Sequence, residues 1–273
     1  MNNKNNLIIV FVLLLIPFFA ISGGENRPTG ARSSALGNAS VALSDLWSAF
    51  NNQAGLANIE TSSAGFYYEN RYLLKELGYK AGAFVYPMKS GTIGLSFNHF
   101  GYSAFNESKI GLAFAKGFGK YLSFGLQLDY NMTRLAESYG SQNYVTFEAG
   151  VLANITPKLV LGAHIYNPIS AKIAEYNDER APVVFRVGAA YSISEKFTLV
   201  AETEKNIYTD PTVSAGLEYK PNERFFLRGG ASTGPSALSF GAGFLFGNFL
   251  LDISTSYHNI LGYSPQASIS YKF

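Results

Sequence analysis

The feature that most constrains this chain is a two-residue alternation of apolar with polar or small side chains, repeated through most of its length. In the segment 183–191, Phe185 and Val187 fall on one face, whereas Arg186 and Gly188 fall on the other. Successive side chains of a β-strand point to opposite faces, so each such segment predicts a strand with one apolar and one polar face.

About fourteen segments follow this pattern, each close to the 9–11 residues that a tilted membrane-spanning strand needs. The predicted strands cover residues 63–72, 78–87, 91–100, 108–117, 121–132, 144–154, 158–167, 183–193, 196–206, 212–220, 224–232, 237–246, 249–259 and 265–273. Connections after even-numbered strands are short, and those after odd-numbered strands are generally longer, the longest being 167–182. This arrangement is typical of an outer-membrane barrel of a Gram-negative bacterium, with short turns and both chain ends expected in the periplasm.

The composition favours a membrane barrel over a soluble β-sandwich. Charged residues make up 15% of the chain, compared with roughly 25% of an ordinary soluble domain. A sandwich would also carry more lysine on its polar faces. The net charge of +2 argues against a nucleic-acid partner, and the absence of cysteine excludes disulfides and thiolate metal sites. We therefore expect an all-β, transmembrane antiparallel β-barrel of about 14 strands.

The N-terminus has the pattern of an export signal. Lys4 precedes an apolar run over residues 7–19, and small residues follow before Gly23. We predict a signal peptide over residues 1–22. The alternative, an uncleaved membrane anchor, is disfavoured because the apolar run falls short of the roughly 20 residues that span a bilayer.

Inward-facing positions of the predicted strands carry charges of both signs. By parity they include Gln127 and the lumen-lining candidates Glu69, Arg71, Asp129, Glu148, Arg186, Glu202, Glu204, Glu218, Arg228 and Asp252. Such a set can form a hydrogen-bonded lumen in which opposite charges pair, or it can form a polar path for a ligand. The first interpretation is favoured, since open pores usually segregate charge to set their selectivity.

Glycine also recurs at inward positions, namely at Gly94, Gly111, Gly125, Gly150, Gly162, Gly188, Gly216, Gly241 and Gly243. Glycine in a strand often marks a place where another backbone approaches closely. A barrel of fourteen strands leaves more interior room than one of eight, so another segment can lie inside it.

The segment SALGNASVALSDLWSAFNNQAGLA, residues 34–57, is the one stretch that predicts a helix. We expect residues 23–61 to form a helical hatch in the lumen of a barrel formed by residues 62–273; the alternative is a helix packed on the barrel's lower rim. Small side chains would let the hatch approach a glycine-lined wall, where Trp47 and Phe50 would wedge.

The start of this segment carries a recognisable motif. Its positions are Arg32, Leu36, Gly37, Asp45, Asn52, Gln53 and Gly55, with the aromatic residues Trp47 and Phe50 between them. Residues 30–57 resemble the hatch segment of the FadL-like outer-membrane barrels, in particular the PorV/PorQ branch of Bacteroidetes. Gln53 stands where that family has proline, so the fixed φ of proline is absent here. We expect Arg32 and Asp45 to find opposite charges on the inner wall.

The resemblance implies two alternative functions. PorV/PorQ members act as accessory subunits of type IX secretion, whereas FadL-type members transport hydrophobic compounds such as fatty acids through a lateral opening. Because the strands use nearly all of the chain, little is left for an external apolar groove, and we favour the accessory role with FadL-type transport as the alternative. A kinked strand or an apolar cavity beside Trp47 would favour transport. An uninterrupted wall around a filled lumen would favour the accessory role.

No enzymatic activity, cofactor or metal is expected, because His99, His164 and His258 lie on different predicted strands without ligand spacing. The expected partners are outer-membrane lipids, a protein of a secretion or assembly complex and, under the transport hypothesis, a small hydrophobic molecule. Barrel-assembly machinery is expected to read the last strand, which ends with Tyr271 and Phe273. Tyrosines near strand ends predict interfacial girdles: Tyr67, Tyr68, Tyr72, Tyr86, Tyr102, Tyr121, Tyr130, Tyr144, Tyr191, Tyr257 and Tyr271.

Overall fold

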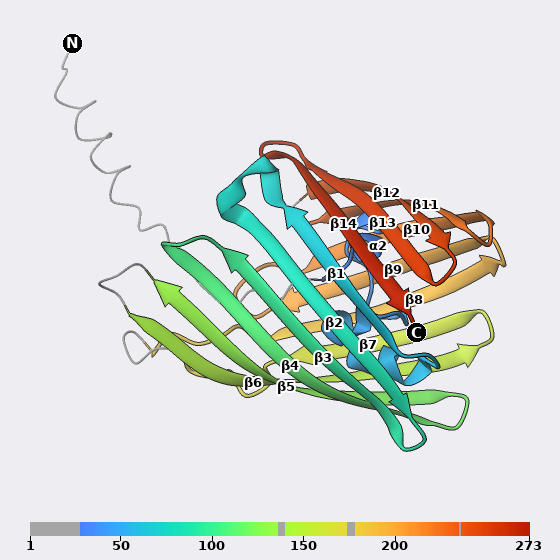
Figure 1. Cartoon of the computed structure of the whole chain (residues 1–273), viewed down its shortest axis with the longest axis horizontal. Coiled ribbons are helices and arrows are strands. Elements are labelled where there is room, and N and C mark those ends of the chain that lie inside the picture. The colour runs from blue at the N-terminus through green and yellow to red at the C-terminus, as the bar shows by residue number, and fades with distance from the viewer. Residues whose placement is uncertain (1–27, 136–139, 174–177, 235) are drawn as a thin grey trace, which may run out of the picture.

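The computed structural model describes residues 28–135, 140–173, 178–234 and 236–273; the predicted signal peptide lies outside them. Fourteen antiparallel strands form a closed barrel in which sequence neighbours pair and the first strand pairs with the last (Figure 1). The predicted fold class is therefore confirmed. The strands are β1 (Ser63–Asn70), β2 (Gly78–Met88), β3 (Gly91–Gly101), β4 (Phe105–Phe118), β5 (Leu122–Leu135), β6 (Ser141–Thr156), β7 (Leu159–Tyr166), β8 (Val184–Ser194), β9 (Phe197–Asn206), β10 (Thr212–Asn222), β11 (Phe225–Thr233), β12 (Ser236–Phe246), β13 (Phe249–His258) and β14 (Gly262–Lys272).

The observed strands differ from the predicted ones mainly at their ends. Strands β4, β5 and β6 are 14, 14 and 16 residues long, since their alternation continues into polar residues beyond the apolar core of each segment. Strand β1 is shorter than predicted. It stops at Asn70, and the 3₁₀ turn η2 (Arg71–Leu73) follows because Tyr72 and Leu73 adopt φ values of 55° and 59°. Arg71, predicted on a strand, therefore lies in this turn.

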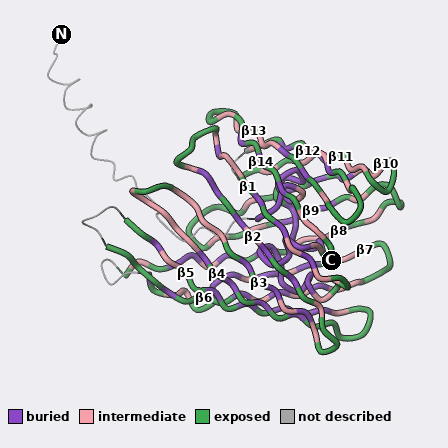
Figure 2. The backbone as a smooth tube through the Cα atoms, in the orientation of Figure 1, coloured by how far each residue is buried: buried purple, intermediate pink, exposed green. Residues whose placement is uncertain are grey.

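The two faces of the sheet have opposite character. Outward Leu126 and Leu128 expose 62% and 59% of their surface, whereas inward Asp129 and Glu148 expose none. Figure 2 shows this contrast as exposed outer positions around a buried interior. An apolar outside around a polar inside suits a barrel surrounded by lipid. Within the described part of the chain, no helix is both long and apolar enough to span a membrane.

Connections after odd-numbered strands lie at one end of the barrel, which we call the loop end, and those after even-numbered strands lie at the other, the turn end (Figure 1). The backbone N–H of Phe273 donates to the carbonyl of Ser62 at 2.9 Å, so the C-terminus lies at the turn end. Register shifts occur only beside the short turns after β6, β8 and β10 among the described pairs. The pairing of β2 with β3 and of β3 with β4 is continuous.

Residues 28–61, which we call the hatch, lie inside the lumen and not on its rim. The prediction of one continuous helix is wrong, because the hatch holds three short helical pieces: α2 (Ala31–Ala35), α3 (Ser48–Asn51) and the 3₁₀ helix η1 (Gln53–Asn58). The chain reverses after α2, where Gly37 and Asn38 have φ values of 69° and 71°. Helix α2 packs against β12 and β13, and η1 packs against β4, β5 and β6, so the hatch crosses the lumen.

Candidate functional site

The hatch meets the inner wall at three clusters of charged and polar side chains. The first, the Glu218 cluster, joins Arg32 of α2 to β10, β11 and β13. Arg32 donates from Nη2 to Glu218 at 2.8 Å, and Arg228 donates to Glu218 and to Asp252, both at 2.6 Å. Burial alone would lower the pKa of Arg32, but the carboxylates of Glu218 and Asp45 hold that pKa above its ordinary value.

Asp45 differs from expectation, because its partner lies within the hatch and not on the wall. Its Oδ2 accepts from Arg32 Nη1 at 3.1 Å, and its Oδ1 accepts from the backbone N–H of Trp47 at 2.9 Å. The Asp45 carboxylate thus begins the turn that carries Trp47 and orients Arg32 toward the wall. Hatch geometry and wall contact are coupled through this side chain.

The second, the Glu202 cluster, holds the hatch by its backbone. Glu202 of β9 accepts hydrogen bonds from the backbone N–H groups of Ser40 and Val41, at 2.7 and 2.8 Å. Arg186 of β8 lies 3.8 Å from Glu202 and pairs with Glu204 at 2.7 Å. A charged acceptor for two consecutive backbone donors makes a strong contact, since hydrogen bonds to an ionised group are stronger than neutral ones.

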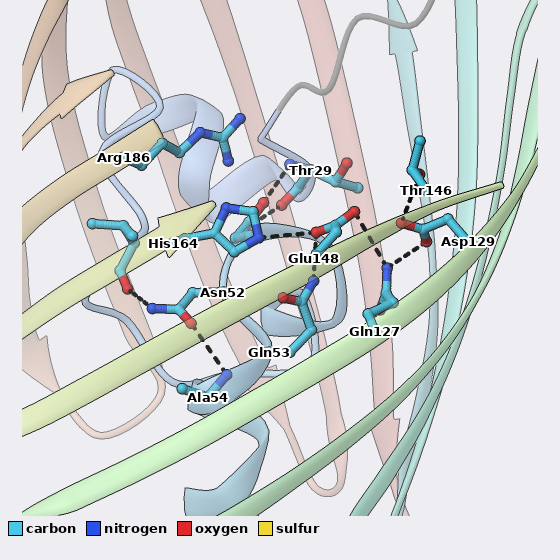
Figure 3. Close-up of polar contacts among 12 residues, drawn as sticks. Thr29, Asn52, Gln53, Ala54, Gln127, Asp129, Thr146, Glu148, His164 and Arg186 are labelled. Carbon is cyan, nitrogen blue, oxygen red and sulfur yellow. Dashed lines mark hydrogen bonds and ion pairs between the residues drawn. The ribbon is translucent and has the colours of Figure 1, made fainter. Parts of the chain in front are cut away.

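The third, the Glu148 cluster, is fully buried (Figure 3). Glu148 of β6 accepts from Gln53 of η1 and from Lys109 of β4, each at 2.7 Å. It also contacts His164 of β7 at 2.9 Å and accepts from Gln127 of β5 at 3.5 Å. Lys109 also lies 3.9 Å from Asp129 of β5. Gln53 therefore supplies the polar contact of the hatch to this cluster.

Lys109 and His164 are members of the site that the sequence interpretation missed. Lys109 shares the parity of Gly111, an inward position of the same strand, and this signal could have found it. His164 likewise shares the parity of Gly162 on β7. Within the described part of the chain, no group of three or more histidine or acidic side chains could hold a metal ion.

Asn52 links two arms of the hatch to the wall. Its Nδ2 donates to the carbonyl of Val41 at 2.6 Å and to that of Val151 on β6 at 3.2 Å. Its Oδ1 accepts from the backbone N–H of Ala54 at 3.1 Å, which begins η1 (Figure 3). Gly55 fits here because a Cβ would lie 2.5 Å from the Ser48 hydroxyl.

Wall glycines mark the path of the hatch. A Cβ at Gly216 would lie 2.6 Å from the carbonyl oxygen of Leu36, and one at Gly241 would lie 2.6 Å from the Cβ of Ala35. The hatch likewise occupies the space beside Gly94, Gly125, Gly150, Gly162, Gly188 and Gly230. Gly37 is the reverse case, since its own Cβ would lie 2.6 Å from the backbone of Ala231. Backbone contacts this close require glycine.

One side of the lumen is largely apolar, with Thr92 and Ser96 of β3 as its buried polar residues. Its inward apolar residues, which we call the apolar sector, are Tyr67, Tyr79, Ala81, Ala83, Val85, Ala113 and Ala115 of β1, β2 and β4. Trp47 packs edge-on against Tyr67 with ring centroids 5.9 Å apart, and Phe50 and Leu56 pack beside it. The prediction that Tyr67 and Tyr144 belong to the interfacial girdles is wrong. Both side chains are buried, because their positions in the strands point into the lumen.

A cavity of about 440 Å³ lies toward the loop end, with Ser34 and Asn38 of the hatch at its floor. Its lining is mostly hydroxyls, amides and carboxylates, including Glu204, Asp210, Ser232, Ser256 and Gln266. Pro28, the first described residue, also lines it, so the described chain begins toward the loop end. At its edge Glu69 pairs with Arg71 at 3.2 Å, and the Arg71 guanidinium lies 5.3 Å from the Phe100 ring.

The last strand places its aromatic side chains on the outside. Phe273 exposes 65% of its surface, and Tyr271 packs against Phe249 with ring centroids 4.6 Å apart. The role of these residues in recognition by assembly machinery stays a prediction.

No protein-family model and no curated protein matches this chain. Several solved structures share its fold. The CymD monoaromatic hydrocarbon channel is 14% identical, with 92% of this chain and 98% of that chain covered and a TM-score of 0.72. The toluene transporter TbuX of Ralstonia pickettii is 12% identical, with coverages of 91% and 98% and a TM-score of 0.70. A FadL homologue of Pseudomonas aeruginosa is 12% identical, with coverages of 92% and 100% and a TM-score of 0.68.

At these identities the similarity establishes a FadL-like fold, which is consistent with an outer-membrane location. CymD is a channel and TbuX a transporter. Nothing in them points to the PorV/PorQ branch, to type IX secretion or to Bacteroidetes.

Proposed function

We propose that this chain is an outer-membrane transporter of small hydrophobic or amphipathic compounds, gated by its hatch, with the turn end in the periplasm. The observation that carries the proposal is the apolar sector, which Trp47 and Phe50 of the hatch cover. The structural neighbours support it, because CymD is a monoaromatic hydrocarbon channel and TbuX is a toluene transporter. The accessory role, favoured on the sequence alone, becomes the second candidate.

The contacts between the hatch and the wall are compatible with reversible withdrawal of the hatch from the lumen. Each wall cluster keeps an ion pair of its own without the hatch: Arg228 with Asp252, Arg186 with Glu204, and Lys109 with Glu148. The second carboxylate of each cluster, Glu218, Glu202 or Asp129, would share the same cation, so withdrawal of the hatch would leave no wall charge wholly unpaired. Unpaired buried charges are the costly case, so this arrangement lowers the free energy of opening.

Withdrawal would also expose the apolar sector and the ring of Trp47 to water, at a cost of roughly 25 cal/mol per Å² of apolar surface. A hydrophobic compound lying along Tyr67, Tyr79 and the neighbouring alanines would cover that surface again. Such a compound binds the open state better than the closed one, and it thereby shifts the equilibrium toward opening. Substrate and gate are coupled through the same surface.

The polar cavity narrows the substrate class. A compound entering from the loop end passes hydroxyls and carboxylates before it reaches the apolar sector. The hydroxyls of Tyr67 and Tyr79, bonded in the closed state to Ser34 and Thr29, would offer partners to a polar group on the substrate. Small aromatic or amphipathic molecules fit these features better than long alkyl chains.

A disulfide between hatch and wall tests the proposal. A Cβ at Gly94 of β3 would lie 3.9 Å from the Cβ of Ala49, close to the separation in disulfides, and the chain has no other cysteine. The variant Ala49→Cys/Gly94→Cys should lose uptake of a radiolabelled monoaromatic hydrocarbon when oxidised and regain it on reduction. The single variants Ala49→Cys and Gly94→Cys are the controls. Gly94→Cys accounts for the contact of its new Cβ with Leu56 Cδ1 at 2.8 Å, and uptake by both controls should be independent of the oxidant. If gel mobility shows that the disulfide is complete and uptake still persists, the hatch is not the gate.

A second candidate is an accessory subunit of a secretion or assembly machine of PorV/PorQ type. The continuous pairing of β2, β3 and β4 favours it, because no strand kink opens the wall sideways along these strands. Gentle purification from native outer membranes followed by mass spectrometry separates the two candidates. A stoichiometric co-purifying protein would support the accessory role, whereas a lone barrel with a bound hydrophobic molecule would support transport.

A further inference from the structure

We propose that the turn end of the barrel carries a basic collar that binds the anionic phosphate groups of phospholipids in the adjoining leaflet. The collar consists of Lys89, Lys116, Lys120, Lys158, Lys196, Lys220, Arg224 and Lys272. The inference uses only the barrel and its turns, and it stands whether or not the hatch gates transport.

The collar follows the whole circumference of the barrel. Its members lie in or beside five of the six short turns and on the last residue of β14; the turn between β12 and β13 lacks one. Neighbouring turns touch: the backbone N–H of Ser192 donates to the carbonyl of Lys158, and that of Lys220 donates to the carbonyl of Lys196, both at 2.8 Å. The cations therefore form a ring and not a patch on one side.

The collar is short of negative charge. In the described part of the chain, none of its eight side chains forms an ion pair with a carboxylate, whereas Arg32, Arg186 and Arg228 inside the lumen all do. The carboxylate side chains at this end are Glu60, Glu195 and Glu223. Lys116 points to the lipid side by strand parity. Lys220 and Lys272 share the inward parity of Glu218 and Ser268 and lie at the mouth of the barrel. An anionic ligand would supply the negative charge that these eight cations lack.

Aromatic side chains fix the height of the collar. Lys120, Lys196 and Lys272 directly adjoin an aromatic residue of their strand or turn. The Lys116 ammonium lies 6.0 Å from the ring of Phe118. Exposed aromatics of membrane barrels lie at the level of the lipid headgroups, and lysine extends its charge beyond its apolar stem. The ammonium groups are therefore placed at the phosphate level.

Two comparisons favour lipid over a protein partner. A protein docked at the turn end would cover part of the ring, whereas lipids surround all of it. At the loop end, Lys172 and Arg180 pair with Asp178, and Lys205 donates to the carbonyl of Thr209. Among the described residues, Lys75 and Lys80 at that end also lack a carboxylate partner, but these two do not form a ring around the barrel.

Native mass spectrometry of the full chain can test the collar. The barrel is purified in detergent and mixed with equal amounts of phosphatidylglycerol and phosphatidylcholine. The wild type should retain phosphatidylglycerol preferentially. The variant Lys158→Ser/Lys196→Ser should lose much of this preference, by up to roughly fivefold for each lysine removed. The matched control Lys75→Ser/Lys80→Ser removes the same charge from the loop end and should keep it.

Heat-modifiable gel mobility confirms that each variant is folded. An unchanged lipid preference in the collar variant, or an equal loss in the control, overturns the proposal. A collar variant that keeps its lipid preference but loses a co-purifying acidic protein would assign the collar to a protein partner instead.

Discussion

Glu148 is the residue on which one whole side of the lumen depends. It is completely buried and accepts from Lys109 of the wall and Gln53 of the hatch, with His164 as a third partner. We expect Glu148→Gln to lower the free energy of unfolding by about 3–5 kcal/mol, because it leaves the Lys109 ammonium with Asp129 at 3.9 Å as its nearest carboxylate.

The measurement is urea unfolding in lipid vesicles, followed by the fluorescence of Trp47, the one tryptophan of the chain. Glu195→Gln, in an exposed turn, is the matched control and should change the stability by less than about 0.5 kcal/mol. Equal stabilities for the two variants would show that the Glu148 cluster does not hold the lumen together.

Adding one methyl group at Gly162 tests how closely the hatch packs against the wall. A Cβ at this position would overlap the carbonyl of Val41, and we expect Gly162→Ala to lift this part of the hatch. Emission of Trp47 should then shift to longer wavelength. Gly117→Ala is the control, because its Cβ would have its nearest neighbour at 3.9 Å, and its spectrum should match that of the wild type.

Parity explains what the sequence could predict of individual residues. Once a strand is recognised, each inward position follows by counting, and the buried Arg186, Glu202 and Asp252 were found in this way. Their partners were not, because the register between strands sets which charges meet. Glu148 meets Lys109 from two strands away, a proximity that no pattern within one strand contains.

At the scale of elements, the hatch is an insert whose shape the wall determines. Its three helical pieces are four to six residues long, too short to be stable alone. Residues 34–57 predicted one helix, since their small and apolar residues have helical spacing. The carboxylate of Glu202 on the wall instead accepts hydrogen bonds from the backbone N–H groups of Ser40 and Val41, so the chain there follows the wall and not a helix.

Substitution of Arg32 should weaken the attachment of the hatch to the wall. We expect Arg32→Gln to raise the conductance of the barrel in planar bilayers, because it removes the ion pairs with Glu218 and Asp45. Asp45→Lys should act in the same direction by placing a second cation beside Arg32. Arg180→Gln removes an exposed ion pair with Asp178 and should leave conductance unchanged. Closed, silent bilayers for the Arg32 and Asp45 variants would contradict this role.

At the scale of the whole molecule, the apolar outer surface of the barrel has to match the lipid around it. Leu128 lies near the middle of β5 and exposes 59% of its surface, whereas Phe118 lies at the turn end and exposes 55%. We expect Leu128→Arg to destabilise the inserted barrel by about 2–4 kcal/mol and Phe118→Arg by about 0–1 kcal/mol. Reversible unfolding from lipid vesicles measures both values, and equal effects would place the membrane elsewhere on the barrel.

The barrel was predictable at this scale because the lipid-facing pattern repeats on every strand, so an error in one segment does not change the count. The course of the hatch was not predictable, since it depends on contacts with strands all around the barrel, from β1 to β14. Pro28 shows this well. The sequence places it just before the hatch, but only the assembled barrel shows that it lies toward the loop end.

The glycines beside the hatch have a consequence for how this protein could change over time. The wall is shaped to fit the hatch at three glycines, Gly162, Gly216 and Gly241. At each of them the hatch fits closely, and a Cβ on the wall residue would overlap it. Hatch and barrel are therefore not interchangeable modules. A hatch taken from another barrel would need its own glycines in the wall, so the two parts must vary together, and exchange of either one alone should yield a barrel that cannot close.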